Sequence, residues 1–247
     1  MRVCLLLALA APLALAQPTR MDMPEGTYDA FVGLTVATSG KETSTLPWLS
    51  VQWPNGVFLT MTSDDGMSLG LHLSDYPTYD YGPLLTMRSR EQRSDTGGGQ
   101  RGWVGDGGGF FAWHIDHSLD LQTQLIYGGG SDQRGLFTQT EVQFATHIAS
   151  HHDATLTLGA QLANQSYLQS YFGVNAAQAA AGGTPMYQPR AGLFNTFIAT
   201  QWDWQLANKW WMYTGLRYNR LAAAAAASPL VDRRGHGSLH VAFAYHY

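Results

Sequence analysis

Apolar and polar side chains alternate with a period of two along much of this chain. The pattern is clearest over residues 119–125 and 154–162, where leucines on one face alternate with polar residues on the other. The last ten residues, Ser238 to Tyr247, alternate in the same way and end on an aromatic side chain. Because successive side chains of a strand point to opposite faces, each segment presents one face to an apolar medium and one to a polar medium.

Segments of this kind recur along the chain and predict twelve strands. We place them at residues 28–38, 45–54, 56–63, 66–74, 79–90, 107–116, 118–127, 136–149, 154–164, 192–206, 210–220 and 238–247. An even number of strands, each about ten residues long, is typical of a bacterial outer-membrane barrel. The predicted fold is therefore an all-β, transmembrane, antiparallel β-barrel.

The lengths of the connections give this barrel an orientation. If the first strand starts in the periplasm, the connections on that side are all short: residues 54–56, 75–78, 117, 150–153 and 207–209. The opposite side receives residues 39–44, 91–106, 128–135, 165–191 and 221–237, and only 63–65 is short there. Bacterial barrels have short periplasmic turns and long outer loops, so the lengths fit the expected topology.

Aromatic residues gather near the predicted periplasmic rim. They are Trp53, Trp202, Trp204, Trp210, Trp211, Tyr245 and Tyr247. Amphipathic rings favour the headgroup level of a membrane, so this set predicts an aromatic girdle. The alternative is a soluble β-sandwich with tryptophan in its core, which explains neither the girdle nor the loop lengths.

The N-terminus predicts export. Arg2 precedes an almost wholly apolar stretch to Leu15, and Ala14-Leu15-Ala16 is a small-x-small cleavage site. We therefore predict a signal peptide over residues 1–16 and a barrel over 17–247, in the bacterial outer membrane. The one cysteine, Cys4, lies in the signal, so the mature chain has no thiolate metal site. A net charge of −4 argues against a nucleic-acid partner.

Little in the chain predicts cofactor or catalytic chemistry. Residues 97–102 spell G-x-G-x-x-G, but neither a buried strand before them nor a helix after them completes a nucleotide site. We read them as part of an outer loop and expect no cofactor. Asn164-Gln165-Ser166 matches a glycosylation sequon, which the bacterial context sets aside.

Histidines and acids near two turns leave weaker alternatives open. The residues are His114, Asp116, His117, His151, His152 and Asp153. They include metal-ligand types without the spacing of a structural zinc site, so solvated turns are the favoured interpretation over a surface metal site. Ser150 beside His147 and His151 is the local candidate for a hydrolase, but adjacent residues point apart. We predict no catalytic residues and no metal site.

A row of polar residues is expected to face the lumen. It comprises Gln122, Gln124, Glu141, Gln143, Thr155, Thr157, Gln161, Asn195, Gln201, Asp203, Arg217, Asn219 and His240. Glu141, Asp203 and Arg217 are its candidate charged lining. A barrel of about twelve strands can be filled or can conduct, so both a polar plug and a narrow pore remain open.

The longest outer loop predicts a short helix. Asn175 is a good N-cap, Ala176 to Ala181 has high helix propensity, and two glycines follow. Aromatic residues around this helix are expected to hold it over the barrel mouth. They are Tyr167, Tyr171, Phe172 and Tyr187. Tyr171, Phe172 and Tyr187 are therefore candidates for a loop lid.

The second half of the chain resembles a known family. Residues 166–174 end in Tyr-Phe-Gly-Val, a small-residue segment follows at 175–180, and residues 183–187 read G-x-P-x-Y. This order, with Gly215 to Leu221 and Ser228 to Val231, resembles the MipA/OmpV family of outer-membrane proteins. The likeness runs from about residue 158 to the C-terminus, and the first half fits more loosely.

The resemblance implies a non-enzymatic scaffold in peptidoglycan biosynthesis. The best-known members bind the lytic transglycosylase MltA and a bifunctional penicillin-binding protein, while others are described as adhesins or antigens. A partner of that kind would reach only the short turns, so the candidate periplasmic docking rim is His117, His151, His152, Trp210 and Trp211. The alternative function is a narrow channel for small solutes, which the polar inward row favours.

Overall fold

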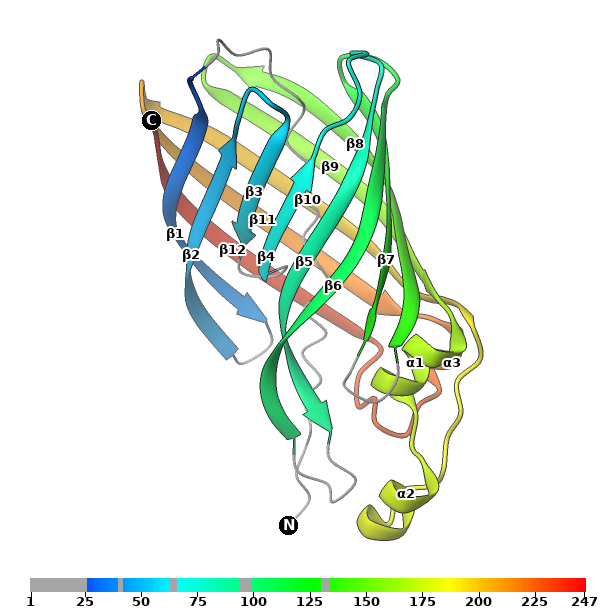
Figure 1. The fold of residues 1–247 in the computed structure, drawn as a ribbon. Helices are drawn as coiled ribbons and strands as arrows, with labels where there is room; N and C mark the ends of the chain where they lie inside the picture. Colours follow the sequence, from blue (N-terminus) through cyan, green and yellow to red (C-terminus); the bar gives the residue numbers. More distant parts are fainter. Residues whose placement is uncertain (1–25, 40–41, 63–65, 94–98, 130–133) are drawn as a thin grey trace.

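Twelve antiparallel strands close into a single barrel (Figure 1). The computed structural model describes residues 26–39, 42–62, 66–93, 99–129 and 134–247, so the predicted signal peptide lies outside the described residues. The strands are β1 (Asp29–Ser39), β2 (Glu42–Gln52), β3 (Val57–Thr62), β4 (Gly66–Leu71), β5 (Tyr79–Arg93), β6 (Gly99–His114), β7 (Leu119–Gly129), β8 (Arg134–Ala149), β9 (His152–Ala163), β10 (Gly192–Ala207), β11 (Trp210–Leu221) and β12 (Gly235–His246). The twelve-strand prediction is confirmed.

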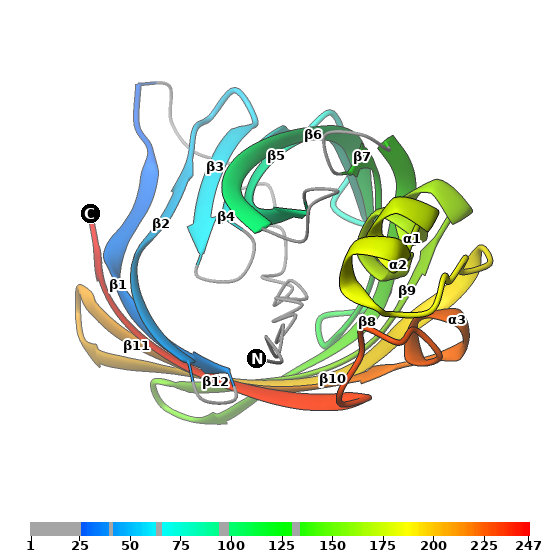
Figure 2. The same cartoon turned by 90° about the horizontal axis from the view of Figure 1, so that it is seen from below.

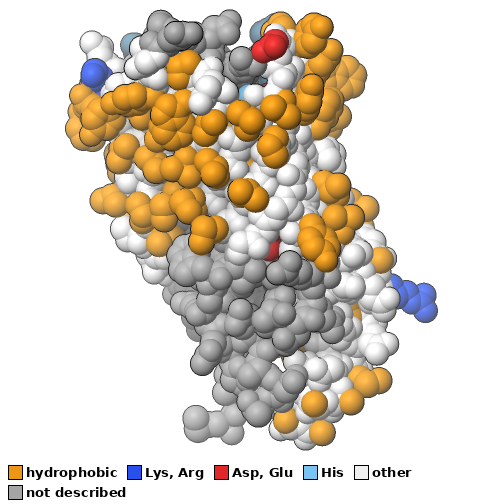
Figure 3. All heavy atoms as spheres, in the orientation of Figure 1, with side chains coloured by type: hydrophobic (Ala, Val, Ile, Leu, Met, Phe, Trp, Pro, Cys, Tyr) orange, Lys and Arg blue, Asp and Glu red, His pale blue; other side chains and the backbone are white. Residues whose placement is uncertain are grey.

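Alternation along each strand separates the two faces of the wall. Val32, Leu34 and Val36 of β1 are exposed on the outside, while the alternate residues Thr35 and Ala37 are buried. β12 pairs with β1 in a register that matches these faces and closes the barrel. Exposed apolar side chains form a broad band toward the end with the short turns (Figure 3). No helix of the described part of the chain has the length and apolar character needed to cross a membrane.

The predicted aromatic girdle needs one correction. Trp210 is exposed on the outer face and packs edge-on against Tyr245. Trp211 points the other way, because neighbours on a strand alternate, and it packs inside the barrel with Phe31 and Tyr213. Trp48 completes this inner aromatic group. Trp211 therefore does not belong to the girdle.

The expected loop over residues 91–106 is also wrong in part. β5 and β6 stay paired from Arg93 opposite Gly99 down the length of the hairpin. Gln100 to Gly102 of the glycine-rich motif therefore belong to a strand, while Gly97 and Gly98 lie outside the described residues. Residues 91–93 and 99–102 contain no apolar alternation in sequence, so the pattern gives no signal although the backbone still pairs.

In the described residues, two helices and one helical turn lie at the end with the long loops. They are α1 (Gln165–Phe172), α2 (Ala176–Gly182) and α3 (Ala223–Ala226). The predicted helix is α2: Asn175 caps it, and Gly183 ends it in the left-handed conformation with φ 65°. α1 was not predicted. Seen from that end, α1 and α2 lie to one side of the barrel opening (Figure 2).

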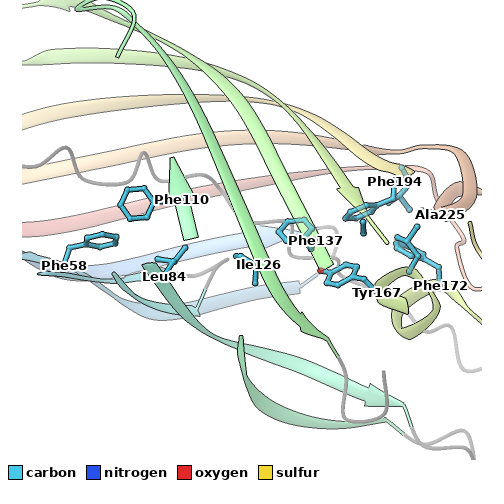
Figure 4. Close-up of a cluster of buried hydrophobic side chains, with 12 residues drawn as sticks. Phe58, Leu84, Phe110, Ile126, Phe137, Tyr167, Phe172, Phe194 and Ala225 are labelled. Atoms are coloured by element: carbon cyan, nitrogen blue, oxygen red, sulfur yellow. The ribbon is translucent and has the colours of Figure 1, made fainter. Parts of the chain in front are cut away.

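α1 is held by the aromatic residues expected to hold α2. Tyr167 stacks on Phe137 of β8, and Phe172 packs against Phe194 of β10. These side chains end an apolar seam that runs along the inner wall from Phe58 (Figure 4). α2 has no buried residue. These aromatic residues hold α1 and not α2 because they are part of α1, and their spacing places them on one face of that helix.

Candidate functional site

Histidine–aspartate pairs line the end of the lumen that carries the short turns. In the described residues they are His72–Asp80, His114–Asp120, His147–Asp153 and His246–Asp29. The second and third each join the two strands of one hairpin, the first joins the residue directly after β4 to β5, and the fourth joins β12 to β1. We call them the turn-end pairs.

The turn-end pairs differ in environment. His72 and Asp80 have side chains 0% and 7% exposed, whereas His147 and Asp153 are 67% and 49% exposed at a nitrogen–oxygen distance of 2.7 Å. His72 is also enclosed by aromatic rings on β3 and β6. Buried polar groups need partners more than exposed ones, so the same chemical pair contributes differently around the rim.

These pairs were not predicted from the sequence, although their spacing carried a signal. His114 and Asp120 are separated by six residues, as are His147 and Asp153, and a tight turn lies between the partners in both cases. In each pair the two residues face each other in the register of their strands. Residues placed symmetrically about a short turn lie opposite each other in a hairpin, so the spacing predicts the contact.

The residues of the predicted docking rim lie on three different surfaces. His117 and His151 are exposed in turns, and the His151 ring donates a hydrogen bond to the side-chain oxygen of Gln205 at 3.1 Å. His152 stacks on Trp202 on the outer wall, on the same face as Trp210. Trp211 faces the lumen. Only the two turn histidines face the solvent beyond the barrel end.

His151 has an unusual backbone. Its φ is 102°, and among the non-glycine residues that the structure describes it alone has a positive φ. Side chains other than glycine pay an energetic cost there, and such positions gather at functional sites. The strain occurs in the turn between β8 and β9, where the side chain is exposed.

The alternatives for metal and nucleophilic chemistry can be located. In the described chain, no group of three or more histidine, cysteine, aspartate or glutamate side chains is arranged to hold a metal ion. His147 bonds Asp153 at 2.7 Å, so its partner is an acid and not Ser150. Asp116 accepts hydrogen bonds from the backbone and hydroxyl of Ser118, which lower the pKa of its carboxyl group. These contacts order the turns.

A continuous chain of hydrogen-bonded polar side chains also crosses the inner wall, starting on β8. Glu141 accepts from Gln139 at 2.9 Å and from Gln143 at 2.8 Å. Gln161 donates to Gln139, and Asn195 donates to Gln161 at 2.9 Å. The chain thus passes from β8 through β9 to β10.

The same chain ends on a buried arginine of β11. Asn195 donates to Asn219 at 3.1 Å, and Arg217 donates to the same oxygen at 3.1 Å. The Arg217 guanidinium also lies 3.5 Å from the ring centroid of Phe197. Asp203 lies nearer the turns and accepts from Gln201 at 2.8 Å. Amides therefore connect Glu141 to Arg217, while Asp203 belongs to a separate part of the wall.

The residues predicted to form a loop lid contact other segments at the loop end. Phe172 is fully buried and its carbonyl accepts from the Ser228 hydroxyl at 2.6 Å. The Tyr187 hydroxyl donates to the Ala224 carbonyl at 2.5 Å, and Tyr171 packs on Tyr167. These contacts join the segment after β9 to the segment after β11 at one side of the barrel opening.

Comparison with known proteins settles the family. Residues 31–247 match the sequence model of the MltA-interacting protein MipA. The chain belongs to the MipA family. No curated protein matches it. The match of residues 31–247 confirms the family that the loop motif predicted.

The fold of this MipA-family chain is similar to solved outer-membrane barrels. The NanC porin superposes with a TM-score of 0.54 at 12% sequence identity, over 87% of this chain and 98% of the porin. A KdgM porin solved in complex with disordered oligogalacturonate gives a TM-score of 0.49 at 7% identity, over 88% of this chain and 99% of the other. The barrel and its family together assign the protein to the bacterial outer membrane.

Proposed function

We propose that this barrel is a non-enzymatic platform that binds a lytic transglycosylase at its periplasmic end. The observation that carries the proposal is the match of residues 31–247 to a family named for interaction with MltA. A bifunctional penicillin-binding protein is the second partner proposed. Such a platform would hold murein-cleaving and murein-synthesising enzymes at the membrane during peptidoglycan biogenesis.

The geometry of the turn end supports this proposal. Hydrogen bonds across the hairpins fix the positions of the turns, and Asp116 and Gln205 bond within or beside the turns that carry the exposed histidines. A rigid surface loses little conformational entropy on binding. Because a stable interface buries at least about 1,200 Å², a partner must contact several turns at once.

Binding of purified MltA to the barrel in lipid nanodiscs tests the platform. His117→Ala with His151→Gly removes both turn histidines, and the glycine accepts the positive φ of His151, so the double variant is expected to fold. We expect binding about tenfold weaker or more. Met186→Ala, in an exposed position at the opposite end, is the matched control. Unchanged binding by the double variant would contradict docking at this rim.

A narrow channel is the second candidate, and the polar chain from Glu141 to Arg217 favours it. Polar side chains inside a barrel can line a path for hydrated solutes. Conductance in planar bilayers tests this function, with Glu141→Gln as the variant because the amide keeps the shape and removes the charge. A channel predicts openings whose ion selectivity shifts in the variant. A barrel without conductance that still retains the transglycosylase would exclude the channel and leave the platform.

A further inference from the structure

A groove of about 550 Å³ lies on the outer surface of the wall formed by β10, β11, β12 and β1. The side chains that line it on this face are Thr38, Ile198, Thr200, Leu216, Tyr218 and Leu239. The apolar ones are exposed, while residues between them in sequence, such as Ala199 and Arg217, are buried toward the lumen. The groove therefore opens to the membrane.

A missing side chain creates this groove. Gly237 lies opposite Tyr218 in the register of β11 and β12, and Leu239 lies opposite Leu216. A Cβ atom added at Gly237 would meet only the Arg217 carbonyl oxygen, at 3.7 Å, which is an ordinary contact. Because backbone crowding does not demand glycine here, the absence of a side chain leaves free space between two apolar walls.

The outer end of the groove is polar. Arg220 is exposed two residues beyond Tyr218 on the same face of β11, about 7 Å along the strand. It pairs with Gly235, and the Tyr218 ring leans across Gly235 so that its hydroxyl lies against that backbone. The phenol hydroxyl thus lies beside the residue that pairs with Arg220, on the face of the wall where the apolar surface ends.

This end of the wall has an excess of positive charge. Arg233 and Arg234 are exposed in the segment that leads into β12, and the Arg234 carbonyl accepts from the Leu221 backbone N–H at 2.7 Å. Asp232 is the acid of the same segment. The long loops place this end at the outer leaflet, where cations favour anionic headgroups.

We propose that the groove binds a phosphorylated, acylated lipid of the outer leaflet. One acyl chain fills the space beside Gly237, between Tyr218 and Leu239. The phosphate accepts hydrogen bonds from the Arg220 guanidinium and the Tyr218 hydroxyl, a geometry in which arginine bonds are strong. The proposal rests on the outer wall and is independent of the platform at the periplasmic end.

Native mass spectrometry of the full-length mature barrel in detergent, with lipid A added, tests this site. Gly237→Leu fills the groove, and Arg220→Gln removes the headgroup cation. We expect each to weaken retention of lipid A about tenfold or more, because each removes one of the two recognition elements. Wild-type protein should also retain dephosphorylated lipid A about tenfold less well than lipid A.

Two matched controls separate the site from general effects. Gly105→Leu adds the same side chain to an open position of β6, where a Cβ atom meets nothing within 4 Å. Lys209→Gln removes an exposed cation at the opposite end of the barrel. Both should bind lipid A as the wild type does. Wild-type retention by the Gly237→Leu variant would overturn the proposal. The proposal would also be overturned if that variant formed fewer barrel dimers and lost no lipid. The groove would then be filled by a second copy of this chain.

Discussion

The two ends of this barrel are held together by different interactions. At the turn end, histidine–aspartate pairs such as His72–Asp80 join neighbouring strands through hydrogen bonds. At the loop end, α1 is fixed by packing of Tyr167, Leu168 and Phe172 against the inner wall. The turn end thus depends on polar contacts between strands, and the loop end on apolar packing of a helix against the inner wall.

The difference shows how each end tolerates change. Hydrogen bonds act between fixed partners, so their contribution depends strongly on burial. Apolar packing scales with the surface removed from water and is lost in proportion to the atoms deleted. Substitutions at the loop end should therefore act as packing losses, while identical substitutions at the turn end should differ from pair to pair.

The largest effect is expected at the loop end. Phe172→Ala removes a fully buried ring from the contact between α1 and Phe194, and should destabilise the docked helix by about 3–5 kcal/mol. Limited proteolysis of residues 164–191 in the folded barrel measures this loss of docking. Met186→Ala in the same segment removes an exposed side chain and is the control. Equal protection of both variants would show that packing of Phe172 does not hold α1.

The next effect is expected at the buried turn-end pair. Asp80→Asn replaces the carboxylate that accepts the His72 N–H with an amide, in a site where the histidine is fully buried. The weakened and partly unmatched contact should lower the free energy of unfolding by about 1–3 kcal/mol. Urea unfolding in lipid vesicles, followed by tryptophan fluorescence, measures the change. A loss below about 0.5 kcal/mol would show that burial does not strengthen this pair.

The strands could be predicted from sequence because the membrane imposes their pattern. Residues 154–162 face lipid on one side and the lumen on the other, so alternation appears directly in the composition. The outer ends of β5 and β6 could not be predicted in this way. Residues 88–93 and 99–102 show no apolar alternation in sequence, and only the backbone pairing of Arg93 with Gly99 reveals the strand.

Contacts between elements were harder to predict than the elements. The apolar residues of α1 could be recognised, but the sequence did not indicate that Asn164, part of a discounted sequon, caps this helix by accepting from Tyr167 N–H at 2.9 Å. The direction of Trp211 followed from simple alternation and was still missed. The polar chain to Arg217 depends on register across four strands, which composition alone does not fix.

The exposed pair His147–Asp153 tests whether burial determines the contribution of a turn-end pair. Asp153→Asn makes the same chemical change as Asp80→Asn, but at a pair whose side chains are about half exposed or more. Water can replace the lost contact, so the free energy of unfolding should fall by about 0–1 kcal/mol. The same urea titration measures it. A loss as large as that of Asp80→Asn would contradict the comparison.

The last effect is local to the two helices that follow β9 and leaves the stability of the barrel unchanged. Asn164 caps α1 and Asn175 caps α2, but only α1 is also held by buried side chains. Asn175→Ala removes a capping box with Gln178 and should cost α2 about 1 kcal/mol locally, without changing the stability of the barrel. Asn164→Ala removes a cap of the same type from a helix that packing still fixes. Hydrogen exchange should therefore accelerate across α2 in the first variant and stay nearly unchanged across α1 in the second. If α1 exchanges as fast as α2 after loss of its cap, the cap and not the aromatic packing holds the loop end in place.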